Sequence, residues 1–153
     1  VYYDVFRASP EIEKEYNAEY LPLDELIKQS DAITMHTFYT KETHHLFGRD
    51  QFALMKKTAF FINASRGRCM DEEALVEALK NDQIAGAGLD VFEFEPKISD
   101  YLYACDKVVM SPHIGTQTLE TRIKMGQECI DGMIDCIHGK HPRNVVNPCV
   151  FDN

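Results

Sequence analysis

Three successive apolar runs of the sequence end in side chains that can hold an anion or move a proton. Arg66 follows "FFINAS", His113 follows "VVMSP", and the run "AGAGL" is followed by three acids, Asp90, Glu93 and Glu95. A guanidinium can grip a carboxylate through two parallel hydrogen bonds. A carboxylate beside a histidine fixes its tautomer and favours its protonated form, which makes the ring a better proton donor near neutral pH. Singly these residues are typical of an ordinary surface; together they indicate a site.

The turn that contains His113 has backbone-restricting residues on both sides. Pro112 forces Ser111 into extended geometry, and Gly115 can bring the backbone close to a ligand. A histidine can also occur in such a turn without a function. The neighbouring strand ends favour the other interpretation, in which the turn holds an acid/base group still.

The elements that would position these residues alternate along the chain. Apolar runs predict strands, and amphipathic stretches with acids in the first turn predict helices. The strands are expected over 1–6, 31–37, 58–65, 84–92 and 107–112, and the helices over 21–30, 50–57, 71–81 and 118–139. The strands are apolar throughout, which is the pattern of a parallel α/β sheet covered on both faces.

Asp4 lies in the first apolar run, "VYYDVF". In a dinucleotide-binding sheet, an acid at the end of the second strand binds the ribose hydroxyls and disfavours a 2′-phosphate, so Asp4 favours NAD over NADP. A solvated carboxylate at a strand end is the alternative, and nearby Arg7 leaves some NADP tolerance open. No G-x-G-x-x-G precedes Asp4, and the chain opens inside an apolar run, so we expect these residues to be part of a longer protein.

The composition is that of an ordinary globular protein, and its charge argues against some partners. The 153 residues carry a net charge of −9, which disfavours nucleic acid and anionic membranes. No apolar run is long enough for a transmembrane helix. The five cysteines form no C-x-x-C pair, so we predict neither a disulfide framework nor a metal site. Such cysteine usage fits a reducing compartment, so we predict a cytoplasmic location.

The motifs in combination resemble those of the D-isomer-specific 2-hydroxyacid dehydrogenases, and the resemblance covers essentially the whole chain. The motifs are N-x-S-R-G, D-V-F-E-x-E-P and P-H-I-G. The resemblance implies that Arg66, Glu95 rather than Glu93, and His113 are catalytic. It also implies contacts to an NAD cofactor from Asp4, Thr37, Ala64, Ser65, Arg66, Asp90, His113, Ile114, Gly115 and Thr116.

The resemblance further implies the organisation and the activity of the protein. Residues 1–140 would form a Rossmann-like, doubly wound NAD-binding domain without its first βα unit and glycine-rich loop. Residues 141–153 would return toward a substrate domain, most of which would lie outside the 153 residues of this sequence. The complete protein would be a homodimeric oxidoreductase that interconverts small 2-oxo acids and D-2-hydroxy acids. The alternative is an NAD-binding, corepressor-like protein on the same scaffold.

Some positions depart from the family pattern. Phe38 stands where proline is frequent, Arg68 and Cys69 where small or apolar residues are common, and Thr116 and Gln117 where smaller residues are usual. We expect these departures to affect the shape of the pocket and the choice of substrate more than the chemistry.

Overall fold

The computed structural model describes residues 1–151. The chain forms two compact units, one ending at His113 and the other beginning at Ile114. Each unit is described by itself.

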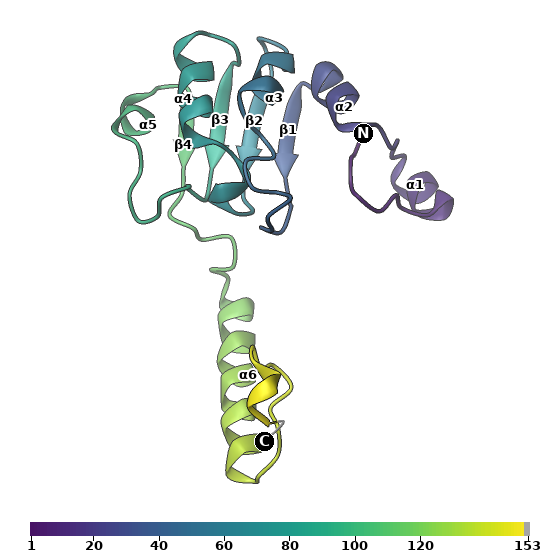
Figure 1. Cartoon of the computed structure of the whole chain (residues 1–153), viewed down its shortest axis with the longest axis vertical. Helices are drawn as coiled ribbons and strands as arrows, with labels where there is room; N and C mark the ends of the chain where they lie inside the picture. The colour runs from purple at the N-terminus through teal and green to yellow at the C-terminus, as the bar shows by residue number, and fades with distance from the viewer. Residues whose placement is uncertain (152–153) are drawn as a thin grey trace. The chain divides into compact units, whose positions relative to one another are not determined.

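The first unit contains a four-stranded parallel sheet in the order β1-β2-β3-β4 (Figure 1). The strands are β1 (Ala32–Met35), β2 (Phe60–Asn63), β3 (Gly86–Leu89) and β4 (Val108–Met110). Met35, Asn63, Leu89 and Met110 are in register, so all four strands end at the same edge of the sheet. The predicted parallel α/β sheet is therefore confirmed.

Helices pack in front of this sheet in the view of Figure 1. The first unit contains α1 (Pro10–Tyr16), α2 (Leu23–Gln29), α3 (Arg49–Leu54), α4 (Glu72–Lys80), α5 (Asp100–Ala104) and the 3-10 helix η1 (Gly67–Cys69). Asp71 caps α4, because its side chain accepts a hydrogen bond from the amide of Ala74. The sequence predicted α2, α3 and α4, but not α1, α5 or η1. Helix α1 buries no residue and so has no apolar stripe, while α5 and η1 are only five and three residues long.

The core lies between the helices and one face of the sheet. Phe52 of α3 and Leu75 and Leu79 of α4 are fully buried, as is Phe61 of β2. Phe47 packs with Phe52 and Phe61 in an aromatic cluster, with ring centroids 4.7–5.3 Å apart. This cluster joins the helical layer to the centre of the sheet.

Within the first unit, side chains on the opposite face of the sheet are exposed. Burial alternates along β1 and β2, so that Ile33 and Phe61 are buried while Thr34 and Phe60 are exposed. Val109 of β4 is 77% exposed. Apolar composition alone did not reveal this alternation, because the outward positions also carry apolar residues.

The opening run also differs from the prediction, because residues 1–6 do not form a strand. Only Tyr2 pairs, in a single parallel bridge with Tyr20. The amide of Tyr2 donates to Glu19 O, and the amide of Leu21 donates to Tyr2 O. One bridge fixes the direction of this segment without the continuous ladder that a strand requires.

The second unit is built on the long helix α6 (Leu119–Ile137), close to the predicted bounds of 118–139, and ends in the 3-10 helix η2 (Pro148–Phe151). Thr118 caps α6 by accepting a hydrogen bond from the amide of Thr121. None of the helices in residues 1–151 is long and apolar enough to cross a membrane.

Candidate active site

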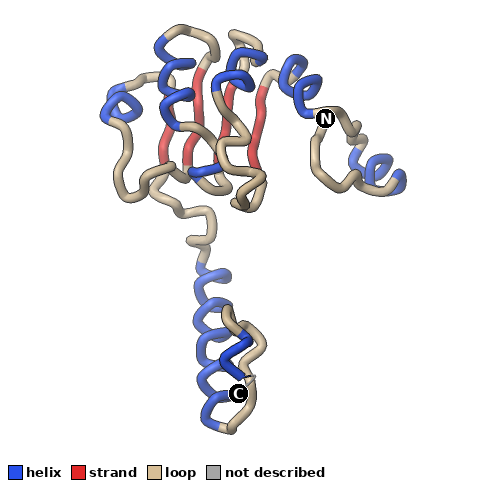
Figure 2. The backbone as a smooth tube through the Cα atoms, in the orientation of Figure 1, coloured by secondary structure: helices blue, strands red, loops and turns tan. Residues whose placement is uncertain are grey.

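The loops that follow the strands carry the predicted site residues. In Figure 2 these loops leave the sheet at the edge where the strands end. Arg66 follows β2, Glu95 lies in the loop after β3, and His113 follows β4. Parallel pairing therefore brings the three to one edge, where open α/β sheets bind ligands.

Glu95 and His113 are in direct contact. The Nδ1 atom of His113 lies 3.0 Å from Oε2 of Glu95. The other carboxylate oxygen, Oε1, accepts a hydrogen bond from the amide of Phe92 at 2.9 Å. Partial burial acts to raise the pKa of Glu95, but the hydrogen bonds from His113 and Phe92 outweigh it, and the pKa lies below its usual value. The carboxylate is thus ionised and faces the imidazole.

Glu93 has different partners, although it is only two residues away. Its Oε1 lies 2.7 Å from Nε2 of His45, and its Oε2 accepts a hydrogen bond from the amide of Glu72 at 3.0 Å. The buried Glu72 side chain in turn accepts hydrogen bonds from the amides of Glu93 and Ser99. Sequence reasoning missed His45 and Glu72, because no local motif connects residues so far apart along the chain.

The backbone at His113 is unusual. Its φ is 54°, in the left-handed region that residues other than glycine seldom adopt. The preceding Ser111 donates from Oγ to Asp90 Oδ1 at 2.5 Å, which links the end of β4 to the end of β3. The turn thus holds His113 through its own backbone conformation and through this neighbouring hydrogen bond.

The loop that contains Arg66 is fixed by hydrogen bonds with a buried side chain at the end of β2. The carbonyl oxygen of Arg66 accepts a hydrogen bond from Nδ2 of the fully buried Asn63 at 3.1 Å. Asn63 Oδ1 also accepts hydrogen bonds from the amide and the hydroxyl of Ser65. The Arg66 side chain is exposed, and its Nη1 donates to the carbonyl of Ser65. A buried asparagine at the end of an apolar run was the sequence signal for this arrangement.

Gly67 allows the Arg66 loop to lie directly against the loop that carries Glu95. A Cβ atom at Gly67 would lie 1.9 Å from the carbonyl oxygen of Phe92, so only glycine fits. The two loops border a pocket of about 550 Å³. Its lining residues are Phe38, Tyr39, Arg66, Gly67, Arg68, Phe92, Glu93, Glu95 and His113. We call this the candidate catalytic pocket.

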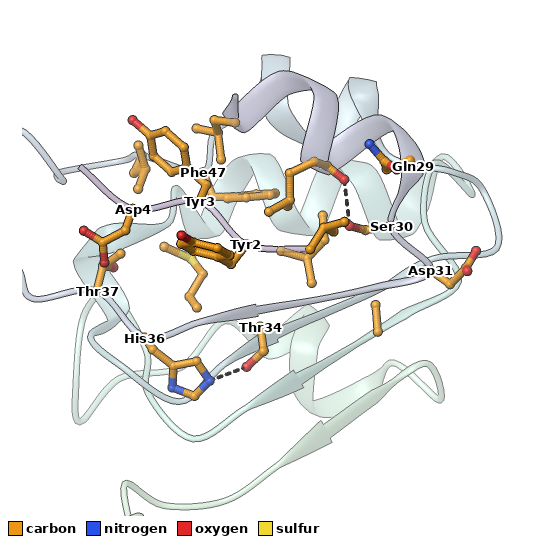
Figure 3. A pocket seen from close by; sticks show the side chains of 17 residues that line it. Tyr2, Tyr3, Asp4, Gln29, Ser30, Asp31, Thr34, His36, Thr37 and Phe47 are labelled. Atoms are coloured by element: carbon orange, nitrogen blue, oxygen red, sulfur yellow. Dashed lines mark hydrogen bonds between the residues drawn. The ribbon is translucent and has the colours of Figure 1, made fainter. Parts of the chain in front are cut away.

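A second cavity, of about 700 Å³, lies between the Val1–Asp4 segment and β1 (Figure 3). Asp4 and Thr37 lie at one end of it, and Gln29 to Asp31 at the other. The Oγ1 atom of Thr37 is buried and has no hydrogen-bond partner among the residues that the structure describes. An unpaired buried hydroxyl beside a carboxylate, in a cavity of the size that holds small molecules, fits a polar ligand such as a cofactor.

The other predicted cofactor contacts are more dispersed. Ser65 is buried and Ala64 is exposed after β2, while Asp90 follows β3. Residues 114–116 belong to the second unit. The structure brings Asp4 together with Thr37, and Arg66 together with Glu95 and His113, but these two groups line separate cavities.

Arg7 is engaged elsewhere. Its guanidinium binds both carboxylate oxygens of Glu13, at 2.8 and 2.9 Å. Hydrogen bonds from Arg7 and Tyr2 lower the pKa of Glu13 to about 2. Arg7, the cation that could have bound a 2′-phosphate near Asp4, is therefore paired with Glu13 instead.

A parallel sheet whose loops at the carboxyl edge carry the candidate site residues is the architecture of the open α/β domains, which bind ligands at that edge. Within this class, the family model described as "D-isomer specific 2-hydroxyacid dehydrogenase, NAD binding domain" matches residues 1–115. The chain belongs to this family. The family and the fold predicted from the sequence are confirmed, and the family description names NAD, the predicted cofactor.

The chain is similar to several relatives that are named as reductases. Over 151 residues it is 46% identical to glyoxylate/hydroxypyruvate reductase B of Klebsiella pneumoniae, covering 98% of this chain and 47% of the relative. The same reductase of Escherichia coli is 46% identical over 153 residues, again with 47% of the relative covered. The chain thus spans about half the length of these relatives.

Solved structures agree with this assignment. The apo form of Rhodotorula graminis D-mandelate dehydrogenase superposes with a TM-score of 0.81 at 37% identity, over 88% of this chain and 39% of that chain. D-lactate dehydrogenase with NAD⁺ from Lactobacillus jensenii gives a TM-score of 0.78 at 34% identity, over 94% of this chain and 47% of that chain.

Proposed function

We propose that the complete protein is an NAD-dependent D-2-hydroxyacid dehydrogenase that interconverts small 2-oxo acids and D-2-hydroxy acids. The observation that carries this proposal is the Glu95–His113 pair, with 3.0 Å between Oε2 and Nδ1, in a pocket that Arg66 also lines. Family membership and the reductases among the relatives support it.

His113 acts as the general acid in the reduction of the 2-oxo acid. Glu95 accepts the hydrogen bond from Nδ1–H, so that the proton to be transferred is carried on Nε2. NADH, when bound, would supply the hydride to the carbonyl carbon of the 2-oxo acid, and NAD⁺ would accept it in the reverse direction. His113 gives its proton to the oxygen of the substrate carbonyl, and takes it back when the hydroxy acid is oxidised.

Arg66 binds the substrate carboxylate and polarises the carbonyl group beside it. A guanidinium suits this role because its planar fork forms two parallel hydrogen bonds with a carboxylate. Its backbone is fixed by Asn63, and its loop is pressed against Phe92 through Gly67. Fixing the loop limits the freedom that the side chain must lose on binding.

Asp4 and Thr37 would hold the cofactor in the 700 Å³ cavity, through the carboxylate and the unpaired Oγ1. The other proposed contacts are Ala64, Ser65, Arg66, Asp90, His113, Ile114, Gly115 and Thr116. Asp4 favours NADH over NADPH because its charge repels a 2′-phosphate. A domain boundary near residue 140, a homodimeric assembly and a cytoplasmic location remain predictions.

The test is NADH consumption by the complete protein with a panel of small 2-oxo acids. We expect turnover, a higher kcat/KM with NADH than with NADPH, and a loss of about 10²- to 10⁴-fold in kcat for His113→Ala, the usual contribution of a general acid. NADH binding, followed by fluorescence, should persist in that variant. NADH binding without turnover of any 2-oxo acid by the wild type would favour a binding protein on this scaffold instead.

A further inference from the structure

The charged side chains that line the candidate catalytic pocket do not pair with one another. Two guanidinium groups, of Arg66 and Arg68, and two carboxylates, of Glu93 and Glu95, line it. The carboxylates are already occupied: Glu93 binds His45 and the amide of Glu72, and Glu95 binds His113 and the amide of Phe92. These acids are therefore not the partners of the two arginines.

The arginines have no carboxylate partner elsewhere in residues 1–151. In that part of the chain, the arginines that form ion pairs are Arg7, Arg49 and Arg143. Arg66 donates only to the carbonyl of its neighbour Ser65, and Arg68 is exposed. The carboxylates of Glu93 and Glu95 offset the charge of the two guanidinium groups in the pocket, but they leave N–H donors of both arginines available to an anionic ligand.

The backbone of Arg68 is fixed as firmly as that of Arg66. The carbonyl oxygen of Arg68 accepts a hydrogen bond from the amide of His45 at 3.0 Å, while that of Arg66 binds Asn63. Gly67, between the two arginines, lies against Phe92, where a Cβ atom would clash. Both guanidinium groups thus extend from a fixed loop that borders one pocket.

From these observations, and resting on the proposed function, we propose that Arg68 binds a second anionic group of the substrate. Arg66 would hold the carboxylate of the 2-oxo acid, and Arg68 a carboxylate or phosphate at the other end of the molecule. Guanidinium groups bind both kinds of anion through paired hydrogen bonds. The preferred substrates are therefore 2-oxo acids with two anionic groups.

The aromatic residues Phe38, Tyr39 and Phe92 also line the pocket, and they suggest the competing possibility. An apolar wall of this kind would suit a 2-oxo acid with a single charge and an aryl side chain. Such a substrate would leave the Arg68 guanidinium without an anionic partner. The two possibilities therefore predict opposite effects of neutralising Arg68.

The experiment measures kcat/KM for NADH-dependent reduction by the complete protein with matched pairs of substrates. Comparing 2-oxoglutarate with 2-oxobutyrate tests whether a second carboxylate is preferred. Comparing 3-phosphohydroxypyruvate with hydroxypyruvate tests whether a phosphate is preferred, and phenylpyruvate tests the aryl alternative. The variants are Arg68→Ala and Arg68→Lys. The control is Arg49→Ala, which removes an exposed arginine that pairs with Glu77 and does not line the pocket.

We expect the wild type to prefer the doubly charged member of at least one pair. In Arg68→Ala that preference should fall by about tenfold, the scale of one charge-assisted interaction, and Arg68→Lys should retain part of it. High salt should weaken the wild-type preference. The Arg49→Ala control should keep the wild-type ratio. The pair that responds distinguishes a carboxylate from a phosphate.

The assignment of Arg68 would be overturned if, for both substrate pairs, the ratio of kcat/KM between the doubly and the singly charged acid in Arg68→Ala stayed within twofold of the wild-type ratio. A wild-type preference for phenylpyruvate over every doubly charged acid would overturn it as well. In either case turnover of singly charged 2-oxo acids would leave the proposed function intact. Absence of turnover with the whole panel would overturn the proposed function and this inference with it. Thermal melting of each variant checks that it is folded.

Discussion

Glu95 touches the amide of Phe92 and the imidazole of His113 with its two oxygens, at 2.9 and 3.0 Å. Its pKa lies below the usual value, so the carboxylate is charged throughout the neutral range. The group is only partly buried, with 38% of its side chain exposed, so solvent screens the pair and its effect belongs to catalysis more than to stability.

The corresponding prediction concerns Glu95→Gln in the complete protein. Removing this charge makes the protonated imidazole less favourable, so the rate of reduction should begin to fall at a lower pH as the pH rises. The loss in kcat should be smaller than the roughly 10²- to 10⁴-fold expected on removing the general acid. The measurement is kcat/KM for reduction against pH. Glu93→Gln, which alters the pair with His45, is the matched control. It should not change the pH at which kcat/KM for reduction begins to fall. Superimposable wild-type and Glu95→Gln profiles would show that Glu95 is not the functional partner of His113.

At the scale of elements, the contact between the loops after β2 and β3 depends on one glycine. A Cβ atom at Gly67 would meet Phe92 O at 1.9 Å, and backbone atoms cannot move aside as a flexible side chain can. We expect Gly67→Ala to destabilise the complete protein by roughly 1–3 kcal/mol, the usual cost of overpacking. It should also lower kcat/KM, because the loop that carries Arg66 is displaced. Urea denaturation gives the first quantity and steady-state kinetics the second.

Gly126 of α6 offers a matched control for this substitution. In the second unit, a Cβ atom there would meet nothing within 4 Å outside its chain neighbours and its own helix backbone, and alanine is favoured over glycine within a helix by about 0.5–1 kcal/mol. Gly126→Ala should therefore be neutral or stabilising. If both variants had the same stability, the close approach at Gly67 would not be a constraint on the fold.

At the scale of the whole molecule, the 153 residues contain Asp4 and Thr37 but no G-x-G-x-x-G sequence. Such a loop binds the pyrophosphate of a dinucleotide through backbone amides at a helix N-terminus. The chain taken alone should therefore bind NAD at least about tenfold more weakly than the complete protein, the equivalent of about 1.4 kcal/mol. Calorimetry on both, with the folded state of each checked by circular dichroism, is the measurement. Equal affinities would contradict this prediction.

The sequence by itself determined the order of strands β1 to β4 and of helices α2, α3, α4 and α6, and the edge of the sheet at which Arg66 and His113 lie. Helical period, capping acids and apolar runs are local signals that act within a few residues, so α4, α6 and the four strands could be predicted from them. The motif resemblance determined the family. Helix α1 could not be predicted because it buries no residue and has no apolar stripe, and the five-residue helix α5 is too short for a period to show.

Only the tertiary structure decided which groups meet. From spacing alone Asp90, Glu93 and Glu95 were equivalent partners for His113, because the path of a loop is set by packing rather than by its own sequence. The structure directs Glu93 to His45 and Glu95 to His113. It also leaves residues 1–6 without a ladder, because strand pairing requires neighbours that no local pattern specifies.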